Sequence, residues 1–176
     1  TGASFTRNTV WQKRLSLWED VVRKAPENAR AHNNLGFIYR EKGMIDQAIP
    51  QFVTALHFRP GYLDAHINLG IAYKEMGLID DAIKEFQTSR SDPKCAVRSM
   101  TMLGICYMEK GLFPRAIESF KSAMDNIPSR DESYWGAQYD LASAYERNGN
   151  LREAFEIYTE IYGRDSKFRQ VAERLS

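Results

Sequence analysis

Three stretches of the sequence decide the fold: LGFIY at residues 35–39, LGIAY at residues 69–73 and LGICY at residues 103–107. They begin 34 residues apart each time, and each opens with Leu-Gly and closes with Tyr. Self-similarity at a fixed period is the signature of a repeat architecture, in which short structural units stack on their neighbours. The spacing therefore predicts a chain built from repeated units around a continuous seam of apolar contacts.

The match continues beyond these stretches. A Gly follows eight residues after each Leu, an Ala thirteen after and a Phe seventeen after. The matching residues are Gly43, Gly77 and Gly111, then Ala48, Ala82 and Ala116, then Phe52, Phe86 and Phe120. A fourth unit keeps the pattern loosely, with Leu141, Ala142, Tyr145, Gly149, Ala154 and Tyr158. It begins 38 residues after Leu103, so we expect about one extra helical turn before it.

Each unit carries two segments with apolar residues at spacings of three and four, which is typical of amphipathic helices. In the first unit, Leu35 and Ile38 mark one helix and Ile49 and Phe52 mark the next. The Gly between them suits the end of a helix and a turn. One such helical hairpin cannot bury its apolar face alone, whereas stacked neighbours can.

These residues resemble the tetratricopeptide repeat, whose pattern runs L-G-x-x-Y, Gly, A-x-x-x-F and Pro. The resemblance covers about three-quarters of the chain and implies an all-α, right-handed α-solenoid of helix–turn–helix repeats. The expected divisions are a lead-in and partial repeat at 1–28, repeats at 29–62, 63–96, 97–130 and 131–168, and a capping helix at 169–176. The last repeat carries a one-turn extension at its start, so its positions are counted from residue 135.

Several helix ends are marked in the sequence. Asp92-Pro93 predicts an N-cap followed by proline at the first helical position, and Pro114 suits the first turn of its helix. The segment from Ser129 to Glu132 has the pattern of a capping box, with Ser129 as N-cap. Pro50 lies four residues after Asp46 and is tolerated only if its helix begins at Asp46, because proline disrupts a helix interior.

The two ends differ from the middle. Residues 1–8 are polar and predict an irregular lead-in, whereas Trp11, Leu15, Trp18 and Val22 recur at helical spacing. The chain starts at Thr1 rather than Met, which favours a fragment of a longer protein.

The segment around Trp11 and Trp18 is also similar to the junction between membrane helices and repeat tails in membrane proteins of the protein O-mannosyltransferase type. This resemblance implies the extracytoplasmic tail of a membrane protein. The alternative is that both tryptophans are core residues of a degenerate first repeat.

Composition limits the function. Charged residues make up 27% of the chain, and the formal net charge is +1, so no electrostatic footprint for nucleic acid is present. No apolar run is long enough to span a membrane, which predicts a soluble fragment in a compartment left open, either cytoplasmic or the extracytoplasmic tail of a membrane protein.

No catalytic or metal-binding constellation is present. The sequence lacks a nucleophile elbow, a P-loop and a dinucleotide fingerprint, so we expect neither an enzyme nor a cofactor. His32 and His66 lie one repeat apart, and a shared packing position explains them better than metal ligation. Cys95 and Cys106 lie eleven residues apart, too far for a disulfide along one helix.

The resemblance places the ligand-binding surface on the first helix of each repeat, which lines a concave groove. Positions two, five, six and nine of each repeat face inward in this family. The predicted ligand-binding residues are Arg30, Asn33, Asn34, Phe37, Asp64, Ile67, Asn68, Ile71, Arg98, Thr101, Met102, Ile105, Tyr139 and Asp140.

Two known groove designs bear on this set. Asn34 and Asn68 resemble the start of the asparagine ladder of O-linked N-acetylglucosamine transferases, but Met102 and Asp140 take the next places. A carboxylate clamp, as in co-chaperones that bind chaperone tails, is disfavoured because Asn33 and Phe37 stand where it needs Lys and Asn.

We therefore predict a non-catalytic protein-interaction module that binds a peptide or partner segment, of mixed charge, in the groove. The alternative is a structural or self-assembly tail of a larger membrane-anchored protein such as a glycosyltransferase, with self-association through the terminal helices.

Overall fold

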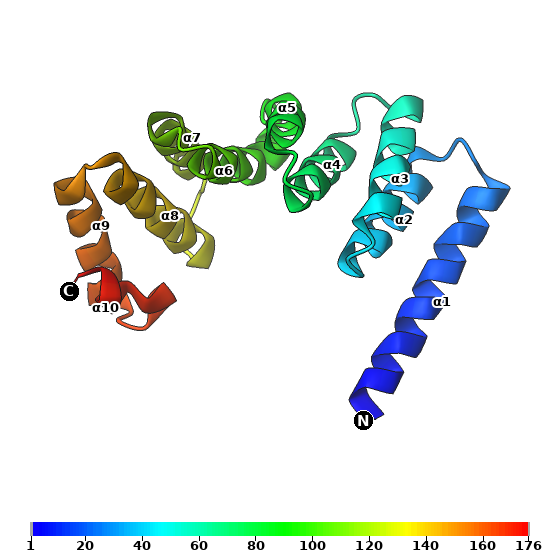
Figure 1. The fold of residues 1–176 in the computed structure, drawn as a ribbon, viewed down its shortest axis with the longest axis horizontal. Coiled ribbons are helices and arrows are strands. Elements are labelled where there is room, and N and C mark those ends of the chain that lie inside the picture. Colours follow the sequence, from blue (N-terminus) through cyan, green and yellow to red (C-terminus); the bar gives the residue numbers. More distant parts are fainter. Residues whose placement is uncertain (1, 176) are drawn as a thin grey trace. The chain divides into compact units, whose positions relative to one another are not determined.

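The computed structural model describes the backbone of residues 2–175 and the side chains of residues 11–175. The described residues form helices joined by short turns, which confirms the predicted all-α repeat fold (Figure 1). The chain divides into two compact units, residues 1–88 and 89–176, and each is described by itself.

Unit 1 contains five helices among its described residues. They are α1 (Gly2–Lys24), α2 (Ala29–Glu41), α3 (Ile45–Phe58), α4 (Leu63–Glu75) and α5 (Ile79–Ser89), of which α5 ends one residue beyond the unit boundary. Helices α2 and α4 begin at the first residues of two predicted repeats. Helix α3 packs against both α2 and α4, so consecutive hairpins share one core.

The shared core is formed by the residues that recur in the sequence pattern. Ala48 and Phe52 of α3 pack with Leu69 and Ala72 of α4, and all four are buried. Gly36 allows the close approach within the hairpin, because a Cβ there would lie 2.8 Å from the Phe52 ring. The signature thus encodes both the packing inside a hairpin and the packing between hairpins.

Helix α1 differs from the prediction at its start. It begins at Gly2, so the lead-in expected to be irregular is helical, and Figure 1 shows one continuous helix (blue). The predicted amphipathic stripe is confirmed, since Trp11, Leu15, Trp18 and Val22 are all half-buried. The helix packs against α2.

Unit 2 contains the remaining elements of the described chain. They are α6 (Pro93–Glu109), α7 (Phe113–Asp125), α8 (Glu132–Asn148), α9 (Leu151–Arg164), a 3₁₀ turn η1 (Phe168–Gln170) and α10 (Val171–Arg174). The pairs α6–α7, α7–α8 and α8–α9 pack in sequence order, as expected for a stack of hairpins.

The end of the chain is not the single capping helix that was predicted. Arg169 and Gln170 take left-handed backbone angles, with φ of 43° and 58°, and they break the segment into η1 and the short α10. Its capping role is nevertheless visible, because Val171 is fully buried in a core with Ala142 and Tyr158. Figure 1 shows this segment (red) folded back beside α9.

The turns inside the hairpins are nearly identical. Gly43, Gly77, Gly111 and Gly149 all have φ between 72° and 86°, a region that residues other than glycine rarely adopt. In the first hairpin Met44 N–H donates to Tyr39 O at 2.9 Å and Gly43 N–H to Arg40 O at 2.8 Å. This pair of bonds is the Schellman motif, which satisfies carbonyls left open at a helix end.

One predicted helix start needs correction, because the N-cap of α8 is Asp131 rather than Ser129. Helix α3 begins at Ile45, one residue before Asp46, so Pro50 is its sixth residue. Asp92 caps α6 by accepting from Lys94 N–H at 2.8 Å, and Pro114 lies in the first turn of α7.

Candidate functional site

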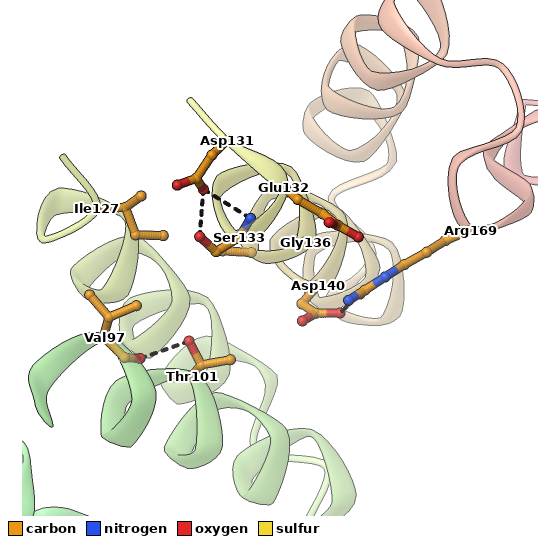
Figure 2. A pocket seen from close by; sticks show the side chains of 10 residues that line it. Val97, Thr101, Ile127, Asp131, Glu132, Ser133, Gly136, Asp140 and Arg169 are labelled. Atoms are coloured by element: carbon orange, nitrogen blue, oxygen red, sulfur yellow. Dashed lines mark hydrogen bonds and ion pairs between the residues drawn. The ribbon is translucent and has the colours of Figure 1, made fainter. Parts of the chain in front are cut away.

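Unit 2 contains a hollow of about 650 Å³ between the first helices of its two repeats, which we name the α6–α8 hollow (Figure 2). Helix α6 supplies one wall, α8 the opposite wall, and η1 reaches in from the C-terminal segment. The lining residues are Val97, Thr101, Ile127, Asp131, Glu132, Ser133, Gly136, Ala137, Asp140 and Arg169. Its volume lies within the usual range of ligand sites, and two predicted site residues, Thr101 and Asp140, meet there.

The first turn of α8 is fixed by its cap. The Asp131 carboxylate accepts from Ser133 N–H at 3.0 Å and from Tyr134 N–H at 3.3 Å, and both the Ser133 and the Ser129 hydroxyl donate to it. These bonds, the Ser133 hydroxyl first, lower the pKa of Asp131. Asp131 is therefore committed to holding the helix end.

The α6 wall is less polar. The Thr101 hydroxyl donates to Val97 O of its own helix at 2.8 Å, so that hydroxyl is engaged within the wall (Figure 2). Ile127 lines the hollow from the segment after α7. This wall offers apolar surface to a ligand, whereas the α8 wall offers charge.

An ion pair closes one end of the hollow. Arg169 Nη1 lies 2.8 Å from Asp140 Oδ1, and the guanidinium carbon lies 5.5 Å from the centre of the Tyr139 ring. Figure 2 shows the Arg169 side chain extended from the C-terminal segment to the face of α8. Gly136 faces the same guanidinium, since a Cβ built there would lie 3.3 Å from Arg169 Nη2.

Asp140 is only partly accessible, with 26% of its side chain exposed. Burial raises the pKa of its carboxyl, and the charge and hydrogen bond of Arg169 oppose that shift without cancelling it. A carboxylate held in such surroundings is a feature of functional sites, although structural ion pairs share it.

A second, smaller hollow of about 170 Å³ lies beside the first in unit 2. It is lined by the predicted residues Ile105 and Asp140, together with Ser143 and Arg147. Asp140 thus contributes to both hollows. Arg98 is exposed, Met102 is half-buried, and neither lines these two hollows.

The predicted residues of unit 1 divide into three groups by burial. Arg30 and Asp64 are exposed, Asn34, Phe37 and Ile71 are half-buried, and Asn33, Ile67 and Asn68 are buried.

The two buried asparagines have an intramolecular role. Asn68 Nδ2 donates to Asn33 Oδ1 at 2.9 Å, which joins the first helices of two repeats. This bond engages the side-chain amide of Asn68, one of the two asparagines that resemble the start of an asparagine ladder. Asp140, which was predicted to face a ligand, forms an ion pair with Arg169 of the C-terminal segment.

Sequence reasoning missed most of the α6–α8 hollow. Gly136 occupies the second, inward position of its repeat, and applying the positional rule to a residue without a side chain would have found it. Arg169 carried no such signal, because it reaches Asp140 across 29 positions of sequence through an irregular turn.

The histidines have the packing role that was expected. His32 Nε2 lies 2.8 Å from Pro26 O and Nδ1 lies 2.8 Å from Gln51 Oε1. His66 repeats this with Pro60 O at 2.8 Å and Glu85 Oε2 at 2.6 Å. Each ring therefore ties a helix to the preceding turn and to the next helix.

Other chemistry has no visible support in the described residues. Cys95 and Cys106 are buried and form no disulfide. No group of three metal-ligating side chains comes together within residues 11–175. The described helices include none with the length and apolarity to cross a membrane.

Family comparisons agree with the geometry. Tetratricopeptide repeat models match residues 17–49, 67–131 and 136–168, and a TPR repeat model matches residues 38–77. The chain is a tetratricopeptide repeat protein. No curated protein sequence matches it. The resemblance of the Trp11–Trp18 region to O-mannosyltransferase tails stays a prediction, and the side chains of residues 7–10 lie outside the described part.

Solved structures of tetratricopeptide repeat proteins share the fold. MamA from Desulfovibrio magneticus RS-1 is 17% identical with a TM-score of 0.80, covering 93% of this chain and 90% of its own. YrrB, described as a TPR protein with an unusual peptide-binding site, is 16% identical with a TM-score of 0.78, covering 97% and 86%. A tetratricopeptide repeat protein from Parabacteroides merdae is 18% identical with a TM-score of 0.82, covering 98% and 67%.

Proposed function

We propose that this tetratricopeptide repeat protein is a non-catalytic interaction module that binds an extended segment of a partner protein. The segment would lie along the first helices of the repeats. The observation that carries the proposal is the α6–α8 hollow, because its walls come from the first helices of two successive repeats. YrrB, which has the same fold, is described as having a peptide-binding site, and this supports the general class of ligand.

The chemistry of the hollow suits a protein segment. One wall is apolar, through Val97 and Ile127, and the other is polar, through Glu132 and Asp140. Apolar contacts supply buried area, while a few polar groups fix the orientation of the ligand. In unit 1 we propose the same role for the accessible members of the predicted set, above all Asn34 and Phe37.

Selection of peptides from a random library on the immobilised chain tests this function. We expect selected peptides to lose affinity when Thr101 or Asn34 is replaced by Arg, because a long charged side chain would obstruct the inner face. Glu118→Arg is the matched control, since Glu118 is exposed on α7, the second helix of its repeat. Equal affinity for all three variants would contradict groove binding.

The second candidate is a self-assembling tail, and one surface favours it. Leu151, Phe155 and Tyr162 are 66%, 55% and 45% exposed, and their spacing places them along one face of α9. Exposed apolar stripes of this kind often mark contacts between proteins. Light scattering across concentration would reveal dimers that Phe155→Glu abolishes, whereas a monomer at every concentration would rule this candidate out.

A further inference from the structure

The end of the α6–α8 hollow is occupied by a side chain of the protein itself. Arg169 places its guanidinium against three separate features of α8: the Asp140 carboxylate, the Tyr139 ring and the bare backbone at Gly136. A carboxylate, an aromatic face and a flat surface without a side chain are the partners that a planar guanidinium uses best. The three features lie within one turn of α8, while the arginine comes from a distant, irregular segment (Figure 2).

The segment that carries Arg169 has an unfavourable backbone conformation. Arg169 and Gln170 both have positive φ, which costs free energy in any residue with a Cβ. An arginine on another chain would reach the same carboxylate without this backbone penalty. The contact between Arg169 and Asp140 is therefore suited to exchange.

The charges of the other residues that line the hollow determine whether it favours a basic or an acidic ligand. Among the described residues that line the hollow, Asp131, Glu132 and Asp140 are acidic and Arg169 alone is basic. The capping bonds engage the Asp131 carboxylate at the helix end, whereas Glu132 and Asp140 are not part of that cap. Once Arg169 leaves, the hollow is negative and disfavours an acidic segment.

We propose that the α6–α8 hollow is a receptor for an arginine side chain of the bound partner, and that Arg169 is its intramolecular substitute. The C-terminal segment must release Asp140 before the partner's arginine enters. This inference rests on the proposed groove function and narrows it, because it replaces a ligand of mixed charge by one with an obligatory basic residue at this point.

The test uses the full chain, labelled with ¹⁵N, and a capped tetrapeptide with the sequence Lys-Phe-Arg-Gln of residues 167–170. Binding is followed through the backbone amides of Gly136 and Asp140. Because an occupied site lowers apparent affinity by the fraction that is open, Arg169→Gln should bind the peptide about tenfold more tightly than the wild type. The same peptide with citrulline in place of arginine should bind that variant at least about tenfold more weakly, since it lacks the charge.

Two further variants distinguish an effect of charge on peptide binding from an effect of disturbed structure. Arg169→Lys keeps a cation on the segment but loses the planar guanidinium, so its peptide affinity should lie between that of the wild type and that of Arg169→Gln. Asp140→Asn in the Arg169→Gln background should remove the preference for arginine over citrulline. Arg164→Gln is the matched control, because Arg164 also lies over an aromatic ring, that of Trp135, yet does not line the α6–α8 hollow.

Several outcomes would overturn the inference. Equal peptide affinity of the wild type and Arg169→Gln would show that Arg169 does not compete. Equal affinity for arginine and citrulline peptides would show that the hollow does not recognise the cation. Library-selected peptides that bind the inner face without a basic residue, and are indifferent to Asp140→Asn, would overturn this inference alone and leave the groove function standing.

Discussion

One position illustrates how a single side chain adapts to its repeat. His32 and His66 both find hydrogen-bond partners 19 residues later, in Gln51 and Glu85. Gln138 occupies the same position in the last repeat, but the residue 19 later is the apolar Ile157. The Gln138 Nε2 donates to the Tyr134 hydroxyl at 2.9 Å, while its buried Oε1 has no partner. An unpaired buried acceptor lowers stability.

The unpaired oxygen gives a stability prediction. Gln138→Met should raise the free energy of unfolding by about 1 kcal/mol, because it removes a buried polar atom that lacks a hydrogen bond. Methionine suits the site, since Met100 occupies this position in the preceding repeat. Urea denaturation measures the change. Gln51→Ile is the reverse control: it leaves His32 Nδ1 without its hydrogen-bond partner and should destabilise unit 1, and a stabilising effect there would contradict the prediction.

The glycine that follows the signature leucine in the first helix of a repeat gives a second prediction. A Cβ at Gly104 would lie 2.5 Å from the Phe120 ring, closer than side chains pack. Gly104→Ala should therefore lower the free energy of unfolding by about 1 to 3 kcal/mol, because the ring must leave its preferred position. Thermal unfolding followed by circular dichroism measures the loss. Gly163→Ala in α9, where no atom lies within 4 Å of the new Cβ, should be neutral or stabilising, and a loss as large as that of Gly104→Ala would refute the steric explanation.

Among the elements, α3 departs most from local expectation. Pro50 lies at its sixth residue and cannot donate the hydrogen bond that the helix requires there. The helix persists because Ala48, Phe52 and Ala55 are buried against neighbouring helices. Tertiary packing therefore outweighs the local penalty.

Removal of this proline should stabilise the protein. Pro50→Ala restores a helical hydrogen bond, and we expect a gain of about 2 kcal/mol, the helix penalty of proline less its benefit in the unfolded chain. Chemical denaturation tests this. Pro114→Ala is the control with the opposite expectation, a small loss, because Pro114 lies in the first turn of α7 where proline is favourable. Similar effects of the two substitutions would contradict the positional argument.

Helix α8 carries two carboxylates whose pKa values shift in opposite directions. Burial raises the pKa of Asp140, so its ionisation costs the folded state stability as pH rises above the unfolded pKa near 3.8. Hydrogen bonds lower the pKa of Asp131, so its contribution is present above that pH and is lost as pH falls through its folded pKa.

Denaturation at pH 7 and pH 3 separates the two. The free energy of unfolding of Asp140→Asn should rise relative to that of the wild type as pH rises, because the substitution removes the cost of ionising a partly buried carboxyl. The free energy of unfolding of Asp131→Asn should fall relative to that of the wild type over the same pH change, because the substitution removes hydrogen bonds to an ionised cap. Shifts of the same sign for both variants would contradict the assigned causes.

For the whole molecule, the repeat made most of the fold predictable. Leu103, Gly104 and Phe120 fixed where helices pair, and local chemistry such as Asp92-Pro93 fixed where one begins. The α8 cap was missed because Ser129 and Asp131 are both good caps, and only the structure shows which one accepts the amide bonds.

The site was predicted less completely than the fold. Positional rules found Thr101 and Asp140, which project from regular helices. They could not find Arg169, because its place depends on two left-handed residues and a contact distant in sequence. Side chains on irregular segments do not recur at the repeat period. The repeat pattern therefore could not predict the residue that closes the end of the hollow.

The balance of charge over the chain predicts its solution behaviour. With 24 basic and 23 acidic residues and an isoelectric point near 7.7, mutual repulsion between molecules is weakest near neutral pH. Static light scattering should give its lowest second virial coefficient close to pH 7.7 and a higher one at pH 5.5. Replacing exposed Lys24 by Glu should move the minimum to lower pH, and an unmoved minimum would mean that apolar patches rather than net charge govern association.

The contact between the glycine of a repeat's first helix and the phenylalanine of its second helix also constrains how such a chain can be recombined. The partners lie 16 residues apart, Gly104 with Phe120, and the last repeat carries Ala142 and Tyr158 at the same two positions. A chimera joined at the turn inside a hairpin would set an alanine methyl against a phenylalanine ring that had faced bare backbone. A chimera joined between hairpins would inherit each pair intact. The repeat is therefore best exchanged as a whole hairpin, with junctions at the segments around Pro60 or Pro128.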